Sequence, residues 1–400
     1  MKRIILFFIS AAIALSCGLS ESDGSIRPSG EDLWKNPSFK PDSSANARKR
    51  LYMTGLDYPD GYDWRADQEN GTVKCSLVVF ADGIPAMKIP VGHEYAVSPD
   101  PDMHRIIDGH LYTDYSTDNE TIIKKDGSEI FRFSGREMIL GMVVLGEDIY
   151  TLGQPRRGEG FAYRKNGTAL IERSGGYAFP RLQTVNGSAC FAFSESIESA
   201  GEKLERYYHV LDEDIRQVAV RDDVKKVWDI LYHEGDVCWL GTLTGISAPV
   251  LSYNGKMSAI DLSKEMTLLT CRLVSAGSSV GMEAIYSDRG QYSSGLWKDA
   301  AKYKLFSNGM IVNGLCTWDD GICCVLNSGT AGGGGTIFRC GESFGLPIGY
   351  SVMGNNPIAM MDGILHVGLS SSSGGKPVIW KDGRITEVDI NGFICTLSVD

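Results

Sequence analysis

Short runs of alternating apolar and polar residues cover most of the chain, and tight turns separate them. The run Pro377–Ile390, PVIWKDGRITEVDI, contains two such strands joined by Asp382 and Gly383. An Asp-Gly pair between alternating runs is typical of a two-residue hairpin, because both turn residues need a positive φ. Similar hairpins begin at Thr121, Phe161 and Pro249. The pattern predicts an all-β chain.

The hairpin turn recurs at an even interval. Its marker is the residue before the turn glycine, or the turn aspartate where the glycine is missing, at positions 82, 126, 166, 212, 254, 299, 340 and 382. The intervals are 44, 40, 46, 42, 45, 41 and 42 residues. A second set of turns interleaves with the first, near residues 109, 146, 187, 235, 281, 321 and 363. Each repeat therefore holds two hairpins, and its four strands are named a, b, c and d in chain order.

A four-stranded repeat of about 40–45 residues is the period of a β-propeller blade. The first repeat lacks strand a and begins with the strands Leu51–Leu56, Val73–Phe80 and Ile84–Val91. Gly392–Val399 resembles a lone strand a after the last complete repeat. Pairing of this strand with the first sheet would complete one blade from both termini and remove an exposed edge. We expect residues 49–400 to form an eight-bladed propeller, with seven blades as the alternative.

Residues 1–17 are expected to be an export signal. Lys2 and Arg3 precede the apolar run Ile4–Leu15, which is too short to span a bilayer as a helix. Ala14–Cys17 resembles a bacterial lipoprotein processing box, although that box usually has Leu at the place of Ala14. The resemblance implies that Cys17 is the lipidated first residue of the mature chain. Ordinary signal cleavage and an uncleaved anchor are the alternatives.

Residues 18–48 are rich in Ser, Pro, Asp and Glu, which predicts a flexible tether. The formal net charge of the chain is −11. An acidic chain without a basic stripe argues against nucleic acid as a partner. It also argues against contact with anionic lipids beyond the Cys17 anchor. We expect a monomer.

Nine cysteines follow Cys17, at positions 75, 190, 238, 271, 316, 323, 324, 340 and 395. Their number is odd, no C-x-x-C spacing occurs, and most lie in apolar strand-like runs. We interpret them mainly as small buried hydrophobic residues. A disulfide between neighbouring strands is the alternative for an exported protein, and we expect no zinc site.

Four segments carry a family resemblance: Ile149–Gly153, Tyr163–Gly167, Gly295–Asp299 and Ile379–Gly383. They resemble the W-K-(D/N)-G repeats of bacterial propeller lipoproteins of the Bacteroidota type, a family of unknown function. The resemblance covers about residues 50–400. It implies the propeller fold and an export route. We expect a cell-envelope location, lipid-anchored in the outer membrane, on the periplasmic side or at the cell surface. The family has no assigned catalytic residues, so the resemblance implies none for this chain.

Strand parity separates the two faces of the disc. The a–b and c–d links are tight turns and must share one face, here named the tight-turn face. The b–c loops and d–a connections lie on the other, named the long-loop face. Because binding residues concentrate on loops held by a rigid framework, we expect the long-loop face to be the working surface.

Aromatic and charged residues in the expected b–c loops are the candidate ligand-binding residues. Tyrosine and tryptophan can stack on sugars or anchor a protein partner, while aspartate and arginine hydrogen-bond hydroxyls or carboxylates. The alternative is that these side chains only cover loop backbone. The candidates are Tyr58, Tyr62, Trp64, Arg65, Asp114, Tyr115, Arg156, Arg157, Asp288, Arg289 and Tyr292.

The chain has no His-x-x-x-His pair. Gly-x-Ser-x-Gly occurs at Gly277–Gly281 and Gly341–Gly345, and Ser-x-x-Lys occurs at Ser373–Lys376. These matches fall in stretches that are predicted to be β-hairpins and loops, without the strand–turn–helix context of a nucleophile elbow, so we assign them no catalytic role. The four glycines at 332–335 lack a following Lys-Ser/Thr, so no phosphate site is expected. The segment Ser287–Tyr292 only faintly resembles an Asp-box turn of sialidases. His93 and His104 flank Asp100 and Asp102 as a possible metal cluster, for which a turn is the simpler interpretation. We expect no cofactor and no metal.

Two functions from different classes lead, and a purely structural role within an envelope assembly is the third alternative. The leading hypothesis is a lipid-anchored, non-enzymatic binding scaffold for a glycan, a peptide or an envelope protein. The rival is a carbohydrate-active enzyme, a glycoside hydrolase or lyase, whose acid and base would come from loop carboxylates. These carboxylates are Asp63, Asp114, Glu195 and Asp288.

Overall fold

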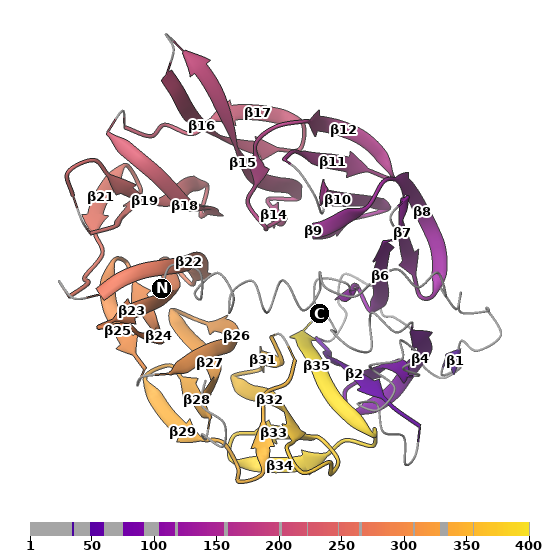
Figure 1. The fold of residues 1–400 in the computed structure, drawn as a ribbon. Helices are drawn as coiled ribbons and strands as arrows, with labels where there is room; N and C mark the ends of the chain where they lie inside the picture. The colour runs from indigo at the N-terminus through magenta and orange to yellow at the C-terminus, as the bar shows by residue number, and fades with distance from the viewer. Residues whose placement is uncertain are drawn as a thin grey trace.

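A computed structural model shows a ring of eight antiparallel sheets, which confirms the eight-bladed β-propeller (Figure 1). The structure describes residues 34–35, 49–59, 75–91, 104–116, 119–155, 159–199, 202–221, 223–246, 248–263, 266–306, 309–328, 335–354 and 356–399. No helix in this described part is long and apolar enough to cross a bilayer. Cys17 and most of the expected tether lie outside the described residues.

Within each blade the strands follow the order a–b–c–d, and strand a is innermost (Figure 1). Blade 1 contains β35 (Gly392–Val399), β2 (Leu51–Asp57), β3 (Cys75–Ala81) and β4 (Ile84–Val91), with β1 (Trp34–Lys35) at its outer edge. Blade 2 contains β5 (His104–Ile107), β6 (His110–Ser116), β7 (Glu120–Lys125) and β8 (Ser128–Ser134). Blade 3 contains β9 (Glu137–Leu145), β10 (Asp148–Pro155), β11 (Phe161–Lys165) and β12 (Thr168–Arg173).

Blade 4 contains β13 (Tyr177–Ala178), β14 (Gln183–Val185), β15 (Ser188–Ser199), β16 (Glu202–Leu211) and β17 (Asp214–Gln217). Blade 5 contains β18 (Val224–His233), β19 (Asp236–Leu243), β20 (Val250–Tyr253) and β21 (Lys256–Ala259). Blade 6 contains β22 (Met266–Ala276), β23 (Ser279–Asp288), β24 (Gln291–Lys298) and β25 (Ala301–Leu305).

Blade 7 contains β26 (Met310–Trp318), β27 (Gly321–Ser328), β28 (Thr336–Arg339) and β29 (Glu342–Gly345). Blade 8 contains β30 (Tyr350–Ser351), β31 (Ile358–Met361), β32 (Ile364–Ser371), β33 (Val378–Lys381) and β34 (Arg384–Glu387). Strand β35 pairs with β2 from Leu51↔Val399 to Asp57↔Gly392, so both ends of the repeat array complete blade 1 as expected.

The repeated c–d turn has a clear physical basis. At Asp126 and Gly127, φ is 50° and 82°, as a type I′ turn requires. Asp126 Oδ1 accepts a hydrogen bond from the Leu111 N–H at 2.9 Å, and the Asp126 N–H donates to the Leu111 carbonyl at 2.7 Å. The turn residue thus ties the c–d hairpin to the start of strand b. The same two bonds occur at Asp82, Asn166, Asp212 and Asp299.

Apolar side chains fill the space between blades. The buried residues form eight clusters, and each cluster joins one pair of neighbouring blades. The cluster between blades 8 and 1 contains Ile394 and Leu397 of β35 together with Val78 and Ile390. The C-terminal strand therefore closes the ring by packing as well as by pairing.

Three details differ from the expectation. The a–b turn of blade 6 lies at Gly277 and Ser278, while Gly281 is inside β23. The b–c segment 194–205, which the sequence predicts to be a loop that carries Glu195, is mostly an extension of the hairpin β15–β16, which projects from the ring (Figure 1). The expected loop 287–294 is likewise strand except for the turn Arg289–Gly290. Long b–c segments that alternate in polarity can pair with each other and need not form open loops.

The innermost strand is interrupted in blades 4 and 8, which lie opposite each other in the ring (Figure 1). In blade 4 the interruption carries Arg181. Its guanidinium donates to the carbonyls of Ile230 at 3.1 Å and Leu273 at 2.6 Å, and it pairs with Asp229 at 3.0 Å. Asp229 Oδ2 also accepts from the Leu273 N–H at 2.6 Å. Arg181 therefore joins blades 4, 5 and 6.

Candidate functional site

A cavity of about 650 Å³ occupies the centre of the ring. Ligand sites commonly have volumes of roughly 300–1,000 Å³. Most of the lining side chains are polar, and they come from blades 1, 2, 6, 7 and 8. The polar ones are His104, Arg105, Thr270, Arg272, Glu283, Asn313, Asn356, Thr396 and Ser398.

Arg272 and Glu283 form an ion pair on one side of this cavity. They are directly opposite each other on β22 and β23, and the Arg272 Nε–H donates to Glu283 Oε2. Glu283 is buried, whereas 52% of the Arg272 side chain is exposed. The carboxylate therefore fixes the guanidinium, and the remaining N–H groups of Arg272 face a space that a ligand can enter.

Arg105 and Asp114 form a second pair on the opposite side. Their closest charged atoms are 3.5 Å apart, and Arg105 also donates to the Ile139 carbonyl at 2.9 Å. Arg105 comes from β5 of blade 2, and Arg272 comes from blade 6 across the ring (Figure 1). Two arginines, each held by a carboxylate, thus line the same cavity from opposite blades.

His104 links this cavity to the closing strand. Its Nε2 lies 2.7 Å from Thr54 Oγ1, which in turn lies 2.7 Å from Thr396 Oγ1. Burial lowers the pKa of His104 to about 3, and the positive charge of Arg105 contributes. The ring is therefore neutral at physiological pH and carries no charge into the cavity.

The described candidate residues do not gather at one place. Tyr58 is buried, and its ring lies 6.4 Å from that of Phe393. Tyr115 and Tyr292 are exposed on the long-loop face, in blades 2 and 6. Arg289 occupies the turn between β23 and β24 with φ of 50°. Tyr62, Asp63, Trp64, Arg65, Arg156 and Arg157 lie outside the described residues.

The described carboxylates of the enzyme hypothesis come from blades 2, 4 and 6, so no two of them share neighbouring blades. Asp114 pairs with Arg105, and Glu195 Oε1 accepts from Arg173 Nε at 2.9 Å. Asp288 Oδ1 is buried and has no hydrogen-bond partner among the described residues.

Sequence reasoning missed Arg105, Arg272 and Glu283. The candidate binding residues were expected in the b–c loops, whereas these three side chains lie on the two inner strands a and b. Their signal is a charged residue within an otherwise apolar inner strand, as in CRLVSA and MEAIYSD. That signal becomes specific only once strand a is known to line the channel.

Exposed apolar residues favour the long-loop face. Of the fourteen large exposed hydrophobic residues in the described chain, five lie on outer strands d and seven on this face. The seven are Tyr115, Met138, Tyr177, Leu204, Ile246, Tyr292 and Ile348. Trp318 is at the tight-turn face, and Met353 is in the interruption of the inner strand of blade 8. That this face is the working surface stays a prediction.

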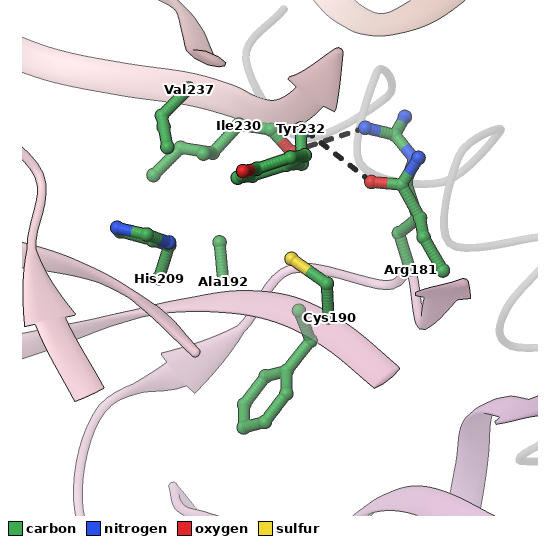
Figure 2. A pocket seen from close by; sticks show the side chains of 9 residues that line it. Arg181, Cys190, Ala192, His209, Ile230, Tyr232 and Val237 are labelled. Carbon is green, nitrogen blue, oxygen red and sulfur yellow. Dashed lines mark hydrogen bonds between the residues drawn. The ribbon is translucent and has the colours of Figure 1, made fainter. Parts of the chain in front are cut away.

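A second cavity, between blades 4 and 5, is only about 10 Å³ (Figure 2). Arg181, Cys190, His209 and Tyr232 lie around it, and burial lowers the pKa of His209. His209 Nδ1 is buried without a hydrogen-bond partner in the described structure. A space of this size holds about one water molecule, which could serve this nitrogen. It is too small for a ligand.

The described residues contain no group of three or more His, Cys, Asp or Glu side chains arranged to hold a metal ion. Of the possible cluster near residue 100, only His104 is described, and it contacts Thr54 as above. His93, Asp100 and Asp102 lie outside the described residues.

No family model and no curated protein sequence matches the chain. Among the solved structures that resemble the chain at low identity are two peptidases and a dehydrogenase. Pyrococcus horikoshii acylaminoacyl peptidase is 10% identical with a TM-score of 0.46, over 79% of this chain and 58% of the peptidase. The dihydro-heme d1 dehydrogenase NirN in complex with DHE is 11% identical with a TM-score of 0.48, over 87% and 74%.

The third is prolyl oligopeptidase B from Galerina marginata, which is 9% identical with a TM-score of 0.40, over 81% of this chain and 56% of the oligopeptidase. The chain thus spans less than two thirds of the length of either peptidase. Similarity at this level assigns no activity to this chain.

Proposed function

We propose that the protein is an exported, lipid-anchored, non-catalytic binding protein that takes part of a glycan into its central cavity. The observation that supports the proposal is the placement of Arg105 and Arg272 in one cavity, on opposite blades and each beside a carboxylate. Glycan hydroxyls both donate and accept hydrogen bonds, so paired donors and acceptors on two sides of a cavity suit them.

Charge balance favours a polyhydroxylated ligand over a strongly anionic one. Each guanidinium is compensated by Asp114 or Glu283, and His104 is neutral. Neutral hydroxyls hydrogen-bond to such pairs without disturbing this balance, whereas an anion would meet the neighbouring carboxylates. Tyr115 and Tyr292 are exposed on the long-loop face. They would contact the sugar units of the glycan that lie outside the cavity, since aromatic rings pack on sugar faces.

The location proposed is the outer membrane, with Cys17 as the lipid attachment site. The apolar run before Cys17 and the Ser-, Pro- and acid-rich segment after it support this arrangement. Replacing Cys17 with Ala should move the protein from the membrane fraction to the soluble fraction and abolish labelling by a fatty-acid analogue. Unchanged fractionation of the Cys17→Ala variant would contradict the anchor.

The binding function is tested with the full chain on an array of bacterial and plant polysaccharide fragments. The best ligand is then titrated against wild type, Arg272→Gln and Arg216→Gln. Arg272→Gln should weaken the affinity at least about tenfold, since a hydrogen bond to a charged group is lost. Arg216→Gln is the matched control, because Arg216 pairs with Asp214 on the outer strand β17. An empty array, or equal weakening by both substitutions, would contradict the proposal.

The same experiment separates binding from the rival enzymatic function. A binding protein returns the glycan intact, whereas a hydrolase releases new reducing ends and a lyase releases unsaturated ones. Turnover that is lost in Asp114→Asn or Asp288→Asn would replace the binding proposal by the enzyme.

A further inference from the structure

The c–d turn of blade 7 departs from the repeat at a single residue. Seven blades have Asp or Asn at the first turn position, and blade 7 has Cys340 there, with φ of 44°. A thiol is a weak acceptor and cannot replace the bond that Asp126 makes to the Leu111 N–H. The Cys340 turn therefore lacks the side-chain tie found at five of the other turns.

The Cys340 thiol points to another cysteine of the same blade. Its Sγ lies 3.2 Å from Sγ of Cys323 on β27. A Cβ atom on Gly321 would lie 2.4 Å from Cys340 Sγ, so only glycine at this position leaves room for the thiol. Cys323 is fully buried, whereas Cys340 is exposed on the tight-turn face. The pair is thus within reach of a reagent in solution through Cys340.

The two cysteines are neighbours across the hairpin of β27 and β28. Cys323 is the Cα partner of Arg339, and Cys340 follows Arg339 directly at the first turn position. A disulfide needs an S–S distance of about 2.0 Å, so the sulfurs must approach by only about 1 Å.

We propose that Cys323 and Cys340 form a disulfide in the mature protein, which ties the c–d turn of blade 7 to strand b where other blades use a carboxylate or amide. The oxidant is a disulfide compound, either glutathione disulfide or a disulfide-exchange protein. A thiolate of the pair attacks the oxidant's S–S bond, which forms a mixed disulfide and releases the first oxidant thiol. The thiolate of the second cysteine then attacks the mixed disulfide at the cysteine sulfur and releases the second oxidant thiol. Two protons and two electrons leave the cysteines, and the oxidant's disulfide becomes two thiols.

Two neighbouring cysteines provide internal controls. Cys316 faces Cys323 across β26 and β27 and is the competing partner. Cys324 is adjacent in sequence, but its side chain is buried in the cluster between blades 6 and 7. Partial burial of the thiol and its contact with Cys323 raise the pKa of Cys340 to about 12, so its reactive thiolate is scarce at neutral pH. Oxidation of the folded chain is therefore expected to be slow and to speed up at alkaline pH.

The test incubates the reduced full chain with glutathione disulfide at mildly alkaline pH, alkylates the remaining thiols after unfolding, and maps the peptides by mass spectrometry. Wild type, Cys316→Ala and Cys324→Ala should each yield a peptide that links the segment around residue 323 to Cys340, with loss of two free thiols. Cys323→Ala should abolish the linked peptide. Full alkylation of Cys340, glutathione attached to Cys340 alone, or a link between Cys316 and Cys323 would overturn the proposal.

Discussion

At the scale of single residues, the turn aspartates explain why the repeat is visible in the sequence. Each carries a positive φ, and at five turns its side chain also caps the backbone of strand b. Asp and Asn meet both demands, because they tolerate the left-handed region and accept hydrogen bonds locally. The variation between Asp and Asn along the chain follows from this shared chemistry.

Replacing Asp299 tests this role. Asp299→Ala removes the bond from the Val280 N–H and places a residue without local hydrogen bonding at φ of 49°. We expect a loss of about 1–2 kcal/mol in the free energy of unfolding. Asp299→Asn should stay within about 0.5 kcal/mol of wild type, since Asn166 makes the same bond in blade 3. Equal losses in the two variants, measured by urea unfolding, would contradict the capping role.

His104 predicts a dependence of stability on pH. Its pKa is about 3 in the folded chain against 6.5 as its ordinary value, so below pH 6.5 the unfolded chain binds more protons. The stability that depends on a neutral His104 is therefore fully present above pH 6.5 and is lost as the pH falls toward 3. Between pH 7 and pH 5, protonation of His104 in the unfolded chain should lower the free energy of unfolding by about 2 kcal/mol.

The His104→Gln variant isolates this contribution. Its free energy of unfolding should fall less than that of wild type between pH 7 and pH 5, and the difference between the two falls should be about 2 kcal/mol. Urea unfolding at both pH values measures it. Parallel losses in wild type and variant would show that His104 does not titrate as inferred.

At the scale of elements, the interruption of the inner strand of blade 4 carries polar contacts that hold three blades together. Arg181 in this interruption donates hydrogen bonds to backbone carbonyls of β18 in blade 5 and β22 in blade 6. Asp229 forms an ion pair with Arg181 and also accepts a hydrogen bond from the Leu273 N–H. In blade 8, Asn356 Oδ1 accepts from the Leu315 N–H of blade 7 at 2.8 Å, and the backbone carbonyl of Asn356 accepts from the Leu397 N–H of β35 at 3.3 Å. Polar side chains at the two interruptions thus supplement the apolar clusters.

Arg181→Met should be among the most destabilising single changes in the chain. It leaves the Asp229 carboxylate, which is buried, without its cation, and such a loss destabilises by about 3–5 kcal/mol. Adding Asp229→Asn should restore part of the stability, because the uncompensated charge is removed. The matched control Arg216→Met breaks an exposed pair on β17 and should leave the unfolding midpoint unchanged. Similar midpoints for Arg181→Met and Arg216→Met would contradict this role of Arg181.

At the scale of the whole molecule, β35 closes the ring, and its removal tests the closure. Deleting residues 392–400 exposes the edge of β2 and removes Ile394 and Leu397 from the core. The melting temperature should fall by about 10 °C or more, and unfolding should lose its cooperativity. A synthetic peptide of residues 391–400 should partly restore the melting temperature. A truncated chain that melts like wild type would show that the ring does not depend on this strand.

The fold could be read from the sequence because seven of the eight blades place Asp or Asn at the same turn position. Closure by Gly392–Val399 was predictable for the same reason: it is a strand a without a following hairpin. The central cavity was not predictable, because Arg105, Arg272 and Glu283 meet only after the ring closes. The innermost strand was also not fixed by periodicity, since strands a and b both carry apolar residues on their two faces.

The hairpins β15–β16 and β23–β24 also could not be predicted from the sequence. Their b–c segments are polar and were expected to form loops, yet pairing continues to Ser199↔Glu202 and Asp288↔Gln291. A polar segment is expected to be exposed to solvent, and it is equally exposed in a projecting hairpin and in a loop. Tertiary context therefore decided between the two.

A crystal structure of the full chain bound to its best array glycan tests the central claim most directly. The account predicts one sugar unit in the central cavity, with hydroxyls hydrogen-bonded to the guanidinium groups of Arg105 and Arg272, and the remaining units on the long-loop face. A glycan bound only at the outer strands or on the tight-turn face, with the cavity empty, would contradict it.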